Sequence, residues 1–343
     1  MDEQLIGAKW GSATVLVPTP VVTGVVMDDD PPEVGDVALA EVTKIGAHTR
    51  LEGREGQRQV LYPGDRVIGV FGHRYAPDQF EGYAGLDGRA AHMLSVAGVI
   101  GLVRSRHADQ PAPSRLQILG YLHDLHGQRL NTLRFSLQPP AVAPAARPLT
   151  IAVVGTMMNA GKTTAATALI YGAARQGRMV AAAKVTGTAS GKDVSAMRDA
   201  GARRALDFTA CGWPSTYLCS AAELETTFRT LYASLLRVQP DFIVLELADG
   251  LIQRETALLL QSPLFASHVD ALVLAAGDAL GAEAAARRLR ALRLPVVAVT
   301  GRTSMSPLLV GETESVTGLR CLTRQDLEAG AVFDLVREAV PAS

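Results

Sequence analysis

A lysine and two threonines that follow a glycine, at Gly161–Thr164, are the residues whose types and spacing most directly suggest chemistry. The apolar run Thr150–Val154 before them predicts a buried strand, and Lys162–Arg175 has the pattern of a helix. A tight turn between a strand and a helix directs backbone N–H groups and the positive helix end toward bound phosphate. We therefore expect the Lys162 ammonium to neutralise the β- and γ-phosphates and the Thr163 hydroxyl to coordinate Mg²⁺.

The whole segment matches a P-loop with one irregularity. The usual motif is G-x-x-x-x-G-K-[ST], whereas Gly155 lies one position too early and Thr156 occupies the first place of the motif. The strand, the turn and the start of the helix are nevertheless present, so we predict a nucleotide-binding loop. Its predicted cofactor-binding residues are Thr156, Met157, Met158, Asn159, Ala160, Gly161, Lys162, Thr163 and Thr164.

A second lysine is predicted to lie near the same phosphates. Lys184 closes the apolar run Met179–Val185, and the carboxyl ends of the strands in a doubly wound sheet converge on one crevice. Lys184 is therefore placed to touch the γ-phosphate or an anionic substrate, and the alternative is that it reaches solvent. Asp193 begins a predicted helix at Asp193–Ala202. Its carboxylate either caps this helix or ligates Mg²⁺, directly or through water.

A carboxylate ends a third apolar run. Glu246 lies within Phe242–Leu247, and an acid at a strand tip is what a Walker B role requires, because it must face the metal. An unpaired carboxylate would be costly in such an apolar run, which favours a functional role for Glu246. Asp249 follows in the loop, where it either positions a water, a substrate or a metal, or is a plain turn residue.

These residues need a parallel sheet to bring them together, and the second half of the chain predicts one. Near-continuous apolar strands alternate there with helices, which indicates a sheet covered on both faces. The later strands are predicted at Phe242–Leu247, Val269–Ala275 and Val296–Thr300, and the helices between them at Ala222–Val238 and Ala279–Leu292. The predicted fold class is α/β, with a C-terminal P-loop NTPase domain that has a mostly parallel sheet.

The first half of the chain has a different pattern. Short apolar runs separated by turn residues predict an antiparallel β-rich domain of barrel or sandwich type, and Gln117–His123 with Leu130–Phe135 predicts a hairpin. Residues 138–148 read QPPAVAPAARP, which indicates a semi-rigid linker. The predicted domains are a β-rich domain at 1–137, a linker at 138–149 and a P-loop NTPase domain at 150–343.

The loop with five residues between Gly155 and Gly161 resembles that of dethiobiotin synthetase and its relatives. Lys184, Thr186 and Gly187 are similar to the lysine and the Thr/Ser-Gly that end the second strand in that family, and Glu246 with Gly250 is similar to its later glutamate and glycine. The resemblance implies Mg²⁺ held by Thr163, Asp193 and Glu246, with Lys162 and Lys184 on phosphate or substrate. It also implies a homodimer. The usual Asp-containing loop of that family is replaced here by Met157-Met158-Asn159, so carboxylation of a diamine is not expected.

Two other resemblances compete. Gly191-Lys192-Asp193-Val194-Ser195, followed by Arg198, is similar to the GTP-binding accessory protein of molybdopterin-guanine dinucleotide synthesis. The histidine pairs of that family are missing, since no histidine lies between positions 127 and 267. The chain also resembles two-domain P-loop proteins, one of them associated with D-glutamate N-acetylation.

Candidate substrate residues lie in both halves. The segment Phe71–Tyr83 is dense in aromatic and charged residues, so it is either a ligand-binding loop or a domain contact. Within it, Arg74 could bind a carboxylate through two hydrogen bonds, with Tyr75 beside it. Thr186 and Gly187 are the candidates in the second half. The guanine-specific Asn-Lys-x-Asp is absent after the last strand, which favours ATP and leaves GTP as the alternative.

Composition excludes several classes of protein. The net charge is −1 and aromatic residues make up 5%, which argues against a nucleic-acid or membrane surface. The first ten residues, MDEQLIGAKW, lack the basic start of a signal peptide, and no apolar stretch is long enough to span a bilayer. Three cysteines are too few for a disulfide framework. These features predict a cytoplasmic protein. Its predicted partner is a small, anionic substrate molecule, and neither nucleic acid nor a membrane is expected to bind.

The leading hypothesis is a Mg-ATP-dependent ligase or kinase that phosphorylates a small carboxylate-bearing metabolite, with Lys162, Lys184, Glu246 and Asp249 as catalytic residues. The alternative is a nucleotide-hydrolysing accessory or chaperone protein that inserts a cofactor or binds a partner. A binder with a degenerate P-loop is disfavoured because Lys162 and Thr163 are intact.

Overall fold

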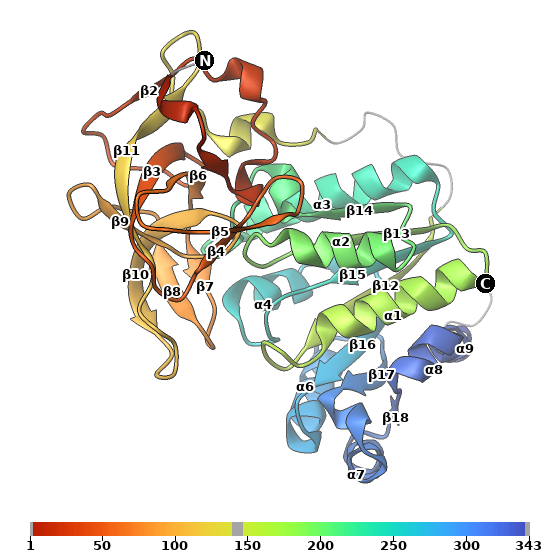
Figure 1. Ribbon diagram of the computed structural model, residues 1–343. Helices are drawn as coiled ribbons and strands as arrows, with labels where there is room; N and C mark the ends of the chain where they lie inside the picture. Colours follow the sequence, from red (N-terminus) through yellow and green to blue (C-terminus); the bar gives the residue numbers. More distant parts are fainter. Residues whose placement is uncertain (1–2, 139–146, 340–343) are drawn as a thin grey trace. The chain divides into compact units, whose positions relative to one another are not determined.

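A computed structural model describes residues 3–138 and 147–339 of the 343-residue chain. The chain divides into two compact units. Unit 1 contains residues 1–138 together with 187–192 and 208–218, and unit 2 contains the remainder. Figure 1 labels most of the helices and strands.

Unit 1 is built on a mixed sheet whose pairings close on themselves. Strands pair in the order β6–β3–β11–β9–β10, and β10 pairs again with β6, which completes a ring of five strands. All of these pairings are antiparallel except β10 with β6. The ring strands are β3 (Val37–Lys44), β6 (Arg66–Phe71), β9 (Ala90–Met93), β10 (Val99–Arg106) and β11 (Arg115–His123). The predicted β-rich domain is thus confirmed as a barrel-like ring with one parallel contact.

Shorter elements extend the ring of unit 1. They are β1 (Lys9–Trp10) on β6, β2 (Gly24–Val26) on β11, β8 (Phe80–Tyr83) on β10 and β7 (Arg74–Tyr75) on β8. A separate hairpin joins β4 (Arg50–Glu52) to β5 (Arg58–Val60).

Alternation along β3, β6, β10 and β11 gives these four ring strands apolar residues on two faces. One cluster takes residues from all five strands, including Ala40, Phe71, Met93, Ile100 and Ile118, and fills the inside of the ring. The other face packs on apolar residues of the first segment of the chain, which include Leu5, Val17 and Val22. A strand that is buried on both sides shows no polar alternation, which explains the short continuous apolar runs in the sequence.

The predicted second strand of the Gln117–His123 hairpin is wrong. Residues Thr132–Phe135 form a 3₁₀ helix, and the Asn131 side chain accepts a hydrogen bond from the Leu133 N–H at its start. An asparagine that can cap a turn outweighed the apolar pattern that favoured a strand.

Unit 2 contains one sheet of seven strands, all parallel, in the order β14–β13–β15–β12–β16–β17–β18. The strands are β12 (Leu149–Gly155), β13 (Val180–Lys184), β14 (Arg204–Asp207), β15 (Phe242–Glu246), β16 (Ala271–Ala276), β17 (Val296–Gly301) and β18 (Arg320–Cys321). The predicted parallel α/β sheet is confirmed, and β12 occupies its centre.

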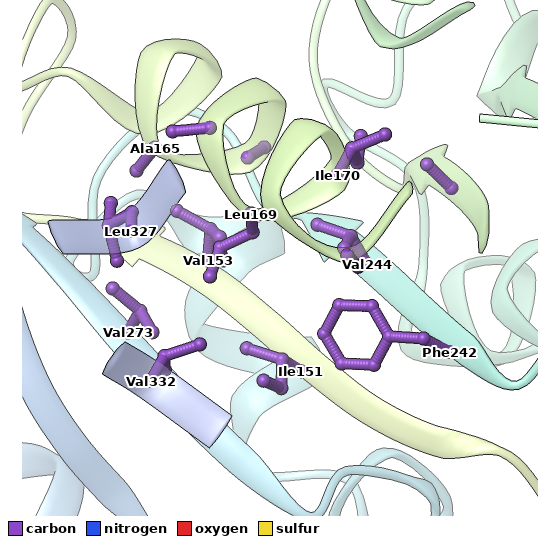
Figure 2. Packing of buried hydrophobic residues seen from close by; sticks show 14 of the residues in the cluster. Ile151, Val153, Ala165, Leu169, Ile170, Phe242, Val244, Val273, Leu327 and Val332 are labelled. Atoms are coloured by element: carbon purple, nitrogen blue, oxygen red, sulfur yellow. The ribbon is translucent and has the colours of Figure 1, made fainter. Parts of the chain in front are cut away.

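Helices cover both faces of this sheet. They are α1 (Lys162–Arg175), α2 (Gly191–Asp199), α3 (Ala221–Leu235), α4 (Arg254–Leu260), α5 (Pro263–His268), α6 (Ala279–Ala291), α7 (Pro307–Thr317), α8 (Arg324–Ala329) and α9 (Ala331–Ala339). Ile151 and Val153 of β12 pack against Leu169 of α1, Leu327 of α8 and Val332 of α9 (Figure 2).

The residues of β12 that alternate with Ile151 and Val153 point to the opposite face of the sheet. Thr150 lies next to Ile151 in β12, and its hydroxyl lies 3.1 Å from the Tyr232 hydroxyl of α3. Because successive strand residues alternate, α3 covers the face opposite to α1. The α1 face buries mainly aliphatic side chains, and each buried leucine or valine contributes about 1.5–3 kcal/mol relative to exposure.

The predicted domain boundary stays a prediction. Residues 139–146, most of the predicted linker at 138–149, lie outside the described residues. Two segments of the second half, 187–192 and 208–218, belong to unit 1. Across 3–138 and 147–339, no helix combines the length and the apolar character needed to cross a membrane.

Candidate nucleotide-binding site

The loop between β12 and α1 has the shape that the P-loop motif predicts. Gly155 ends β12, and Gly161 precedes α1 with φ 106°. Asn159 also has a positive φ, 61°. The Lys162 ammonium turns back over the loop and donates a 2.8 Å hydrogen bond to the Met157 carbonyl. A lysine held above the turn in this way is placed to exchange that carbonyl for a phosphate oxygen.

The remaining loop residues differ in exposure. Met157, Asn159 and Thr164 are exposed, Thr156 and Met158 are half-buried, and Ala160 is buried. The Thr156 hydroxyl accepts a 3.2 Å hydrogen bond from the Gly277 N–H, which ties the first turn of the loop to the segment after β16.

The register of the sheet brings the carboxylate and the second lysine together. Glu246 at the end of β15 pairs with Val153 of β12 on one side and with Lys184 at the end of β13 on the other. Strand ends in a parallel sheet share one edge, and this edge carries the loop that follows β12.

Glu246 is buried, and only one of its two carboxylate oxygens has a hydrogen-bond partner in the described part of the chain. Its Oε1 atom accepts a 2.8 Å hydrogen bond from the Thr163 hydroxyl, whereas Oε2 is buried and finds no hydrogen-bond partner in the described part of the chain. Burial raises the pKa of Glu246, and the positive charge of Lys184 opposes that rise. A buried carboxylate oxygen without a partner is costly unless a ligand satisfies it.

Lys184 and Asp193 form an ion pair beside Glu246. The Lys184 ammonium donates to the Asp193 carboxylate, and both side chains are largely buried. Burial alone would lower the pKa of Lys184, but the charges of Glu246 and Asp193 outweigh it and raise that pKa. Lys184 therefore stays positively charged. The helix begins at Gly191, two residues before the predicted start, so Asp193 lies within the first turn of α2. Its predicted role as a metal ligand stays a prediction.

Asp249 adds a further carboxylate to the site. Burial lowers the pKa of Lys162, and the charge of Asp249 opposes this effect more than that of Glu246 does. The site thus combines the cations Lys162 and Lys184 with the carboxylates Asp193, Glu246 and Asp249. Within the described ranges no three His, Cys, Asp or Glu side chains form a group suited to a metal ion. The predicted binding of Mg²⁺ at this place stays a prediction.

Thr186 is fully buried, and its hydroxyl is used inside unit 2. It donates to the Ala248 carbonyl at 2.5 Å and accepts from the Ala248 N–H at 2.9 Å. Ala248 and Asp249 are joined by a cis peptide bond. The other predicted substrate residues, Arg74, Tyr75 and Gly187, belong to unit 1.

Arg74 and Gly187 have partners within unit 1. The buried Arg74 guanidinium donates to the Gln79 side-chain oxygen at 2.5 Å and lies 3.4 Å from His48 Nε2. The Gly187 N–H donates to the Thr216 hydroxyl at 2.9 Å.

Two residues that shape the site were not among the predicted ones. Gly301 ends β17 and packs against the P-loop, because a Cβ atom there would lie 2.2 Å from the Ala160 carbonyl oxygen. Thr256 of α4 donates a 2.7 Å hydrogen bond to the Ala248 carbonyl. A glycine directly after an apolar strand was the available signal for Gly301. Thr256 carried no signal, since its partner is a backbone atom.

No protein-family model and no curated protein matches the sequence. Among solved structures, the signal recognition particle 54 kDa protein of Aeropyrum pernix in complex with GDP is similar, with 20% identity and a TM-score of 0.37, over 61% of this chain and 53% of that one. The receptor FtsY of Elizabethkingia anophelis in complex with GDP has 16% identity and a TM-score of 0.37, over 62% of this chain and 70% of that one.

A DUF1611 family protein from Anabaena variabilis is also similar, with 16% identity and a TM-score of 0.38, over 59% of this chain and 62% of that one. The chain thus spans about half the length of the Aeropyrum protein. These are distant likenesses, and the P-loop-like α/β fold of unit 2 is established by its own strand order and loop geometry.

Proposed function

We propose that the chain binds ATP with Mg²⁺ on residues 156–164 and transfers the γ-phosphoryl group to a small carboxylate-bearing metabolite. The observation that carries the proposal is the buried Glu246 carboxylate, which holds the Thr163 hydroxyl with one oxygen and leaves the other without a protein partner in the described chain. A hydroxyl and a free carboxylate oxygen directly after a phosphate-binding turn are the groups that hold a nucleotide-bound Mg²⁺.

Thr163 and Glu246 would hold the ion, which would supply positive charge to the β- and γ-phosphates. Lys162 would leave the Met157 carbonyl and donate to the phosphates. Lys184, kept positive by its carboxylate neighbours, would face the transferred phosphoryl group or the acceptor carboxylate. In the transfer, an oxygen of the acceptor attacks the γ-phosphorus while the bond from that phosphorus to the bridging β–γ oxygen breaks. ADP leaves, and an acyl phosphate forms.

The test is ADP release with ATP or GTP and Mg²⁺, screened against a panel of amino acids and small carboxylates. We expect one class of carboxylate to raise ATP turnover about tenfold or more, because an acceptor completes the site. Lys162→Ala removes the charge on the phosphates, so it should abolish this stimulation. Arg175→Ala is the matched control, since it removes an exposed cation at the far end of the same helix.

Flat turnover across the panel, with nucleotide still bound tightly, would contradict phosphoryl transfer to a metabolite. It would instead support an accessory protein whose hydrolysis is stimulated by a partner. Absence of nucleotide binding in the wild-type chain would contradict both.

A further inference from the structure

The loop that carries Asp249 is held by hydroxyl groups from two other elements. The carbonyl oxygen of Ala248 accepts hydrogen bonds from Thr186, which follows β13, at 2.5 Å and from Thr256, in α4, at 2.7 Å. The Ala248 N–H donates back to the Thr186 hydroxyl at 2.9 Å. Both threonines are fully buried, so these bonds do not compete with water.

Gln253, at the start of α4, holds Thr256 in the position from which it contacts Ala248. The Gln253 side-chain oxygen accepts from the Thr256 N–H at 3.0 Å and lies 3.1 Å from its hydroxyl. Gln253 thereby caps the helix and sets the rotamer of Thr256.

The other side of the loop rests on the phosphate-binding turn. The Leu251 N–H donates to the Gly155 carbonyl at 2.9 Å. Gly250 approaches so closely that a Cβ atom there would lie 2.7 Å from the Thr156 carbonyl oxygen. Asp249 therefore lies between Ala248, which two threonines hold, and Gly250 and Leu251, which contact the start of the P-loop.

We propose that Thr186 and Thr256 are positioning residues, which act through Ala248 to hold the Asp249 carboxylate over the nucleotide's phosphates. The assignment rests on the proposed nucleotide site. It gives Thr186 a role other than contact with substrate, because its buried hydroxyl already makes both of its bonds to Ala248. In phosphoryl transfer, a carboxylate held there would orient the attacking oxygen, so its displacement should lower turnover more than nucleotide binding.

The experiment compares Thr186→Val and Thr256→Val with Thr186→Ser and Thr256→Ser in the full-length chain. Valine keeps the shape and removes the hydroxyl, whereas serine keeps the hydroxyl. We expect each valine variant to lower kcat for Mg-ATP hydrolysis about tenfold with KM for ATP changed by less than about twofold, and each serine variant to restore most of the rate. Thr313→Val is the control, because that buried hydroxyl of α7 has no partner in the described chain.

ATP binding without Mg²⁺ is measured on the same variants to show that the fold of unit 2 is kept. Asp249→Asn should reproduce the loss in kcat, and adding Thr256→Val to it should lower the rate little further, because both changes affect one group.

Wild-type turnover that survives in both valine variants would overturn this inference and leave the proposed function standing. A loss in the serine variants equal to that in the valine variants would overturn it too, since packing and not the hydroxyl would then matter. A wild-type chain that hydrolyses no nucleotide would overturn the proposed function, and the inference would fall with it.

Discussion

The Glu246 side chain lowers the stability of the fold, and the same property suits it to bind a cation. A buried carboxylate with an unused oxygen costs stability, because water no longer solvates it. The neighbouring Lys184 offsets part of this cost through its charge. The remaining cost is what a bound cation would relieve, so ligand affinity and folding stability oppose each other at this residue.

Replacing Glu246 by glutamine should weaken the effect of Mg²⁺ on ATP binding without weakening the binding of ATP alone. The amide keeps a hydrogen-bonding oxygen for Thr163 but loses the charge that holds Mg²⁺. We expect the gain in ATP affinity on adding Mg²⁺ to fall by about tenfold or more, which is about 1.4 kcal/mol. Affinity without Mg²⁺ should stay equal or rise, because one negative charge near the phosphates is gone. Titration calorimetry with and without Mg²⁺ measures both. Retention of the full Mg²⁺ effect would exclude Glu246 as a ligand.

A buried histidine gives unit 1 a dependence on pH. His48 Nδ1 donates to the Met93 carbonyl at 3.0 Å, and its Nε2 faces the Arg74 guanidinium. Burial, and then the charge of Arg74, lower the pKa of His48 from 6.5 to about 4. Between pH 6.5 and 4, His48 is therefore protonated in the unfolded chain and neutral in the folded chain. The free energy of unfolding should fall as pH falls through that window, by about 3 kcal/mol in total.

Tryptophan fluorescence reports this loss selectively, because both tryptophans, Trp10 and Trp213, belong to unit 1. Urea unfolding at pH 7 and at pH 4.5 should show a smaller decrease in His48→Gln than in the wild-type chain. His126→Gln, in an exposed turn, is the control and should leave the decrease unchanged. Equal pH slopes in all three proteins would contradict the assignment.

At the scale of elements, unit 2 contains glycines of positive φ at the ends of its helices, and Gly161, before α1, lies in the candidate site. Gly161 combines a positive φ with close packing, since a Cβ atom there would lie 3.0 Å from Gly301 Cα. Gly318 also has a positive φ, 63°, but a Cβ atom there would meet open space. The two positions share the backbone requirement and differ in the packing.

We expect Gly318→Ala to destabilise unit 2 by about 1 kcal/mol, which is the cost of the left-handed conformation alone. Gly161→Ala should cost about 2–4 kcal/mol, because the P-loop must also move away from Gly301. Urea unfolding followed by helical circular dichroism measures both. Similar values for the two variants would show that the contact with Gly301 adds nothing.

The elements of unit 2 could be predicted because local pattern and burial agree there. The predicted and observed limits of α1 coincide at Lys162–Arg175, and β15 was predicted within one residue. In unit 1, the apolar pattern of Thr132–Phe135 predicted a strand. The segment forms a 3₁₀ helix because the Asn131 side chain caps its start. The Lys184–Asp193 ion pair could not be predicted either. The sequence offered Asp193 as a helix cap or a metal ligand, and tertiary packing sets its actual partner.

At the scale of the molecule, unit 1 is completed by residues from the second half of the sequence. The Thr132 hydroxyl donates to the Gly212 carbonyl at 2.6 Å, and Ala189 joins the apolar cluster on the outer face of the ring. A Cβ atom on Gly212 would lie 2.6 Å from Leu133 Cα. Unit 1 therefore includes two segments, 187–192 and 208–218, that follow the proline-rich stretch in the sequence.

A fragment of residues 1–138 should therefore fold poorly, although it contains every strand of the ring. We expect weak near-ultraviolet circular dichroism and binding of a hydrophobic dye, because the fragment lacks 187–192 and 208–218. In the full-length chain, Gly212→Ala should lower the midpoint of tryptophan-detected unfolding, while Gly127→Ala, in an open turn of the same unit, should lower it less. A fragment with native-like spectra would contradict this view.

The central place of β12 has a consequence for the order of events during synthesis. The strands on either side of it, β15 and β16, are translated long after the phosphate-binding residues have left the ribosome. In a nascent chain, Lys162 and Thr163 therefore follow a strand, β12, whose two neighbours have not yet been made. Pairings between distant segments form slowly, because loop closure must precede them. A nucleotide bound as we propose would therefore stabilise the finished domain, and it would not guide the early steps by which that domain is assembled.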